Sequence, residues 1–137
     1  MKKFETLNHT ADVAGRVYGR NRRELFVNAS ELLYSLMSPE FCAGRAAETR
    51  IGLSGDNTEN LLVRFLNELI YYAEVKKTAG SVLRFRIGCR EGRLFLECRM
   101  KSRRIKRQGR EIKAATYHGL RVEKKKGVLT ASVIFDI

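Results

Sequence analysis

The feature that most constrains the fold is a period-two alternation of apolar and polar residues in the last third of the chain. Over residues 83–87, leucine, phenylalanine and isoleucine alternate with two arginines, and residues 94–98 repeat the pattern. Alternation of this kind is typical of a strand with one buried face. Glu91 and Gly92 between the two runs predict a turn, so residues 82–99 are expected to form a β-hairpin.

The same reasoning predicts strands elsewhere. Residues 112–122 alternate again, and residues 128–136 form a nearly continuous apolar run, with a lysine-rich turn at 124–127 between them. On the alternating strand, His118 falls on the apolar face and is expected in the core, whereas Lys113 falls on the opposite face. Three short apolar runs near the beginning predict further strands over residues 3–7, 13–19 and 48–53.

Two amphipathic helices complete the pattern. Asn21, with Glu24 three residues later, predicts the start of the first helix, which must end before Pro39, the only proline. Asp56 is the predicted N-cap of a second helix reaching Val75, and residues 38–48 are expected to form a loop. A length of 137 residues suits one domain. We therefore predict an α+β fold over residues 1–137, with two helices packed on antiparallel β-sheet.

The positive charge is concentrated in one part of the chain. The formal net charge is +12, and residues 99–126 alone hold twelve basic and two acidic side chains. Residues 99–110, hereafter the basic segment, include seven cations and no carboxylate. We expect this segment to be a loop that binds RNA phosphates or an acidic protein surface, because such self-repulsion is costly without an anion nearby. The candidate binding residues are Arg103, Arg104, Lys106, Arg107 and Arg110.

Several classes of protein are disfavoured. No apolar run approaches the roughly 18–20 residues of a membrane span, and the first residues do not resemble a signal peptide. The three cysteines, Cys42, Cys89 and Cys98, form no CxxC pair and are expected to be free thiols. We therefore expect a cytoplasmic protein without membrane association. The sequence holds no recognisable nucleophile or nucleotide-binding motif, which disfavours a self-contained enzyme.

Two aspartates stand at predicted strand ends. Asp12 follows the first predicted strand, with His9 three residues before it, and Asp136 is the penultimate residue, beside the terminal carboxylate of Ile137. Carboxylate oxygens are the preferred ligands of hard cations such as Ca²⁺ and Mg²⁺. A solvated terminus and a turn aspartate are the alternative explanation, and the spacing alone does not decide between them.

Four motifs, taken together and in this order, resemble the archease family. They are HTAD at residues 9–12 with Val13 and Gly15 after it and ELF at 24–26 beyond, NELIY at 67–71, IKAATYHGL at 112–120, and VIFDI at 133–137. The resemblance extends over nearly the whole chain. It implies an α+β domain with an inserted hairpin region. It also implies a protein that is not itself a catalyst but acts with the GTP-dependent RNA-splicing ligase.

On this resemblance, the chain would promote guanylylation of the ligase and its multiple turnover in tRNA splicing and RNA repair. The family's metal site falls on Asp12, Asp136 and Ile137, with calcium expected and magnesium or manganese as alternatives. Lys113 and His9 are the positions implied in ligase activation. The basic segment departs from the polar loop that many archeases carry before the IKAxTYH motif.

Two other functions remain open from the sequence. A basic RNA-binding chaperone would make direct use of the basic segment. A small metal-dependent hydrolase would use Asp12, Asp136 and His9 without any partner.

Overall fold

The structure is a computed structural model that describes residues 1–8 and 12–137. The first half of the chain holds β1 (Phe4–Asn8), β2 (Asp12–Gly19), α1 (Arg22–Met37), β3 (Pro39–Phe41), β4 (Ala47–Gly55) and α2 (Thr58–Tyr71). A π-helical turn (Tyr72–Lys76) extends α2. The second half holds β5 (Thr78–Arg90), β6 (Arg93–Gln108), β7 (Ala114–Thr116), β8 (Val122–Lys125) and β9 (Val128–Asp136).

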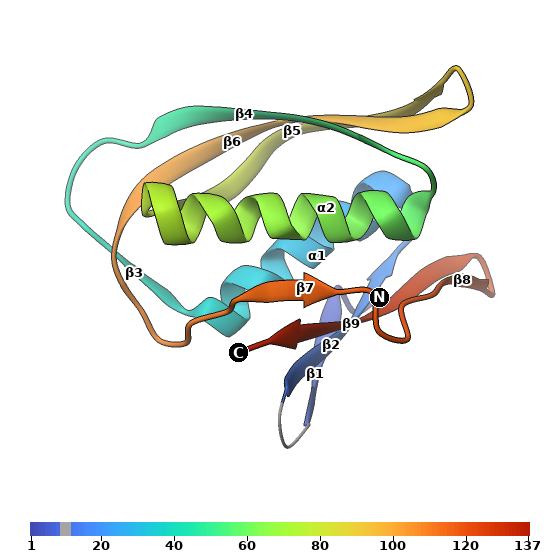
Figure 1. Ribbon diagram of the computed structural model, residues 1–137, viewed down its shortest axis with the longest axis horizontal. Helices are drawn as coiled ribbons and strands as arrows, with labels where there is room; N and C mark the ends of the chain where they lie inside the picture. Colours follow the sequence, from blue (N-terminus) through green and yellow to red (C-terminus); the bar gives the residue numbers. More distant parts are fainter. Residues whose placement is uncertain (9–11) are drawn as a thin grey trace.

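The strands form two antiparallel sheets, and the helices lie between them (Figure 1). The first sheet has the order β1-β2-β9-β7, with β8 also paired to β9. The second has the order β3-β6-β4, with β5 also paired to β6. Helix α1 contacts β2 of the first sheet and β5 of the second, while α2 contacts β7 and β4. The predicted α+β class is confirmed, with two sheets in place of one.

The hydrophobic core is centred on the helix layer because a sheet covers each side of the two helices. The three phenylalanines Phe26, Phe65 and Phe85 come from α1, α2 and β5, and their ring centroids lie 5.5–6.0 Å apart. Each sheet consequently buries only its inner face, which is why its strands alternate. Neither helix in the described ranges is long and apolar enough to cross a membrane.

The predicted caps and turns are largely confirmed. The Asn21 side chain accepts a hydrogen bond from the Glu24 amide at the start of α1, and α1 ends at Met37, before Pro39. The second helix, however, is capped by Asn57 rather than Asp56. Both predicted hairpin turns are present. In each of them a non-glycine residue and then a glycine adopt positive φ, at Glu91–Gly92 and at Lys126–Gly127.

The basic segment is not a loop. Residues 99–108 are the second half of β6, and they pair with β4, β5 and β3. Met100, Ser102 and Ile105 are buried between exposed cations. The prediction failed because the charge of the segment concealed its alternation. The expected loop over 38–48 likewise contains β3 and the beginning of β4.

The predicted strand over 112–122 is also wrong in part. It is divided into β7 and β8 by a turn at His118–Gly119, where Gly119 has a φ of 62°. His118 is consequently exposed rather than buried in the core. Among the cysteines, Cys98 lies opposite Phe85 and Cys89 opposite Leu94, and all three thiols are free.

Candidate functional site

The first sheet brings Asp12 and Asp136 together at one end. They are direct cross-strand partners in the β2–β9 pairing, and the next pair, Val13 and Phe135, is buried. Because successive side chains on a strand alternate between faces, both aspartates lie on the outward face. Side chains of directly opposed residues have Cβ atoms about 4.5–5.5 Å apart. The expected proximity of the two aspartates is therefore present in the structure.

Lys113, which directly precedes β7, lies beside Asp136 at the same end of the sheet. Ala114 pairs with Asp136, and the backbone N–H of Lys113 donates to the Asp136 carbonyl at 2.8 Å. The Lys113 side chain is exposed, and Ile137 retains 45% of its accessible surface. One end of the sheet thus brings together four predicted positions, Asp12, Lys113, Asp136 and Ile137. We call Asp12 and Asp136 the aspartate row.

The aspartate row differs from other acidic groups on this face. Glu5 accepts hydrogen bonds from the Tyr18 hydroxyl at 2.8 Å and from Arg16 at 2.9 Å. The hydrogen bond from Tyr18 above all, then that from Lys2, and the charge of Arg16 hold the pKa of Glu5 below its usual range. Among the described residues, neither aspartate of the row has an ion pair. Like charges directly opposed across a sheet are destabilising, so the row is suited to a bound cation.

Helix α2 fixes the position of β7 through polar side chains. Asn67 accepts a hydrogen bond from the Ala115 N–H at 2.8 Å and donates one to the Ala115 carbonyl at 3.2 Å. Two turns earlier in the helix, Asn60 donates a hydrogen bond to the Tyr117 hydroxyl at 2.9 Å. The sequence reasoning assigned no role to either asparagine. Asn67 is the first residue of the NELIY motif, but the motif does not indicate what its side chain contacts.

His9 lies outside the described residues. Within the described part of the chain, no three histidine, cysteine, aspartate or glutamate side chains gather as a metal cluster. The expected third ligand, the terminal carboxylate of Ile137, is not a side chain of those types. The chemistry of the available donors, two carboxylates and a chain terminus on neighbouring strands, fits a hard cation.

The five candidate cations of the basic segment lie in different surroundings. The Arg103 guanidinium lies 4.8 Å from the Phe41 ring centroid, and Arg107 pairs with Glu40 at 2.6 Å. Arg104 and Lys106 are exposed on β6. Arg110 lies beyond the strand, where its backbone N–H donates to the Met37 carbonyl. The expected loop is therefore wrong, and the binding of an anion or a partner by these cations remains a prediction.

Known proteins of one family match this sequence along nearly its whole length. The sequence profile of the archease protein family matches residues 4–137. Protein archease of Sulfurisphaera tokodaii is 30% identical over 141 residues, covering 100% of both chains. Protein archease of Archaeoglobus fulgidus is 32% identical over 139 residues, covering 98% of this chain and 99% of the relative.

Solved structures show the same fold. The solution structure of Methanobacterium thermoautotrophicum protein 1598 matches with a TM-score of 0.84 and 27% identity, covering 100% of both chains. The crystal structure of a Thermotoga maritima archease, described as a possible chaperone, matches with a TM-score of 0.67 and 28% identity. That match covers 96% of this chain and 94% of the other.

Proposed function

The chain belongs to the archease family, and on that premise we propose that it is a cytoplasmic, non-catalytic activator of the RNA-splicing ligase. In this role it promotes guanylylation of the ligase with GTP and allows multiple turnover. The observation that supports the assignment is at one end of the first sheet, where Asp12 on β2, Asp136 on β9 and Lys113 just before β7 are brought together.

We propose that the aspartate row holds a divalent cation. Asp12, Asp136 and the terminal carboxylate of Ile137 would supply oxygen ligands, as Ca²⁺, Mg²⁺ or Mn²⁺ requires. The bound cation would supply a positive charge that offsets the repulsion between the opposed carboxylates. The protein's contribution is to hold both aspartates at adjacent strand positions, since their backbones are fixed by the β2–β9 pairing.

We propose that Lys113 contacts the ligase and does not perform chemistry. Its backbone is held against Asp136, and the edge of β7 is held by Asn67, while its side chain extends into solvent. An ammonium in this position suits an anionic group of the partner. Because the segment is fixed on both sides, the partner meets a preorganised surface, which lowers the entropic cost of binding.

The test is a guanylylation assay of the ligase with GTP, with and without variants of this protein. Asp12→Asn, Asp136→Asn and Lys113→Ala should each lose most of the stimulation while remaining folded, because none of these side chains packs in the core. Asp56→Asn is the matched control, since this aspartate is 78% exposed and lies away from the row.

Two results would contradict the proposal. Full stimulation by both aspartate variants would leave the row without a role in activation. Consumption of GTP by this protein in the absence of the ligase would instead indicate a hydrolase that uses the same carboxylates.

A further inference from the structure

The outward face of the second sheet carries three arginines side by side. Arg99 on β6 lies directly opposite Arg50 on β4 and directly opposite Arg84 on β5. We call these three residues the arginine row. We propose that the arginine row binds the phosphodiester backbone of single-stranded RNA. This site lies on the other sheet from the aspartate row, and the proposal does not depend on ligase activation.

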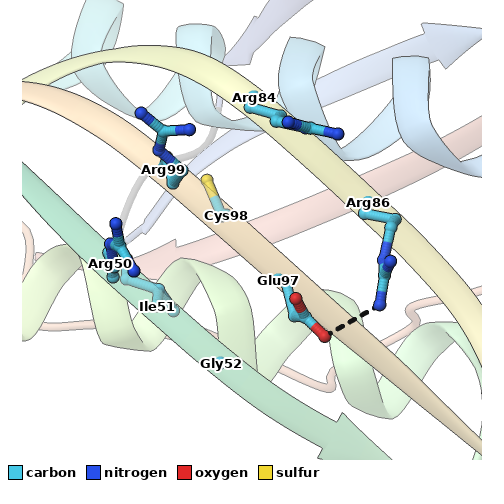
Figure 2. A pocket seen from close by; sticks show the side chains of 8 residues that line it. All are labelled: Arg50, Ile51, Gly52, Arg84, Arg86, Glu97, Cys98 and Arg99. Atoms are coloured by element: carbon cyan, nitrogen blue, oxygen red, sulfur yellow. Dashed lines mark hydrogen bonds and ion pairs between the residues drawn. The ribbon is translucent and has the colours of Figure 1, made fainter.

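The row borders a shallow cavity (Figure 2). The cavity has a volume of about 390 Å³ and is lined by Arg50, Arg84, Arg86 and Arg99 around Gly52 and Glu97. A Cβ at Gly52 would meet no atom within 4 Å, so the lack of a side chain there leaves the space open. Neighbouring strands are about 4.8 Å apart, so the row places the backbones of three arginines at short intervals across the sheet.

The carboxylates on this face do not balance the charge. Glu48 accepts two hydrogen bonds from Arg99, at 2.6 and 3.1 Å, and lies 3.4 Å from Arg50. Glu97 pairs with Arg86 at 3.1 Å. Among the described residues, Arg84 has no ion pair. Like charges directly opposed across a sheet are destabilising, and an external anion would relieve the repulsion.

The residue type favours phosphate. A guanidinium presents a planar fork of N–H donors that matches phosphate oxygens in pairs, whereas lysine acts as a point charge. The row and its neighbour Arg86 are all arginine, while the turn at the far end of the chain is Lys124–Lys126. A closely spaced line of cations matches a polymer with one charge per nucleotide better than it matches scattered carboxylates on a folded protein.

An aromatic ring continues the surface. The guanidinium of Arg90 lies 4.9 Å from the centroid of Phe95, and that of Arg86 lies 5.7 Å from it. Cation–π contacts of this kind hold guanidinium groups over the ring and limit their freedom before a ligand arrives. Lys101 lies beyond Arg99 on β6, so the cationic surface continues along that strand on the side away from Glu97.

The experiment compares two variants of equal charge. Arg50→Gln/Arg84→Gln/Arg99→Gln removes the row, and Lys124→Gln/Lys125→Gln/Lys126→Gln removes three cations from the turn. Binding of a fluorescein-labelled oligouridylate is followed by anisotropy at several salt concentrations, without the ligase. Each phosphate contact to a single strand contributes about 0.7 to the slope of log affinity against log salt.

The arginine variant should therefore lower the slope by about 2, and the lysine variant should leave it near that of the parent. Between about 50 and about 200 mM salt, the parent should lose about 20-fold more affinity than the arginine variant. Thermal unfolding checks that both variants are folded. Arg84→Gln alone, which removes a residue without a described ion pair, should lower the slope by about 0.7.

Three results would overturn the proposal. The first is a parent that does not bind the RNA at low salt, and the second is an equal loss in the two triple variants, which would indicate diffuse charge. The third is an arginine variant that binds RNA like the parent but shows a salt-dependent loss of ligase stimulation, which would indicate an acidic protein surface as the partner. Asp12→Asn should retain full RNA binding, so failure of the activator proposal is recognised separately.

Discussion

The Asn67 side chain offers the sharpest test of how the candidate site is assembled. It makes two hydrogen bonds with the backbone of Ala115, one as acceptor at 2.8 Å and one as donor at 3.2 Å. Strand β7 is only three residues long, and its other side pairs with β9. Asn67 therefore satisfies an edge that would otherwise present unpaired backbone groups.

Replacement of Asn67 by alanine removes both bonds at once. Each typical hydrogen bond contributes about 0.5–1.5 kcal/mol net, so the loss should be about 1–3 kcal/mol. Asn67 is only half-buried and water can replace part of the loss, which favours a value near 2 kcal/mol. For a domain of this size, that corresponds to a fall of about 8 °C in Tm.

The assays are thermal unfolding and hydrogen exchange at the Ala115 amide. The amide should lose protection in Asn67→Ala, and stimulation of the ligase should fall because β7, which Lys113 directly precedes, is held from one side only. Glu68→Gln is the control, since among the described residues this neighbouring side chain makes no hydrogen bond. A Tm within about 1 °C of the parent, with unchanged protection at Ala115, would refute the reasoning.

Two further outcomes are expected. Burial raises the pKa of the Cys98 thiol from 9.0 to about 11. The contribution of this thiol to stability is therefore complete below pH 9 and is lost as the pH rises from about 9 towards 11. Urea unfolding should show a steeper alkaline loss of stability for the parent than for Cys98→Ala, and equal slopes would contradict this. At Gly80, a Cβ would overlap the Lys101 carbonyl oxygen, so Gly80→Ala should destabilise by about 2–3 kcal/mol in urea unfolding. Gly52→Ala, in open space, should stay within about 0.5 kcal/mol, and equal effects would contradict the close approach at Gly80.

Sequence patterns predicted those parts of the structure that depend only on neighbouring residues. The Asn21 cap, the end of α1 before Pro39 and the two glycine turns were all predictable, because each depends on residues within a few positions. The meeting of Asp12 and Asp136 was predictable only from the family resemblance, because their positions at strand ends did not decide it. Their metal and activating roles remain predictions.

Other features depend on contacts between distant residues. Nothing near position 67 in the sequence indicates that Asn67 reaches Ala115, because that contact joins a helix to a strand 48 residues away. The basic segment was misread for a related reason. Its cations suggested a solvated loop, although Met100, Ser102 and Ile105 mark the buried side of a strand. Net charge limits the partners of a protein but not its secondary structure.

The arginine row shows what sheet register adds to the sequence. Arg50 and Arg84 lie outside the basic segment and are 34 positions apart in the chain, yet β6 places Arg99 directly between them. Each sheet turns its inner face to the helix layer, so the polar faces point away from each other (Figure 1). The aspartate row and the arginine row therefore occupy opposite outer layers. A cation at the first and a phosphodiester strand at the second can bind together, because neither ligand competes for the side chains of the other.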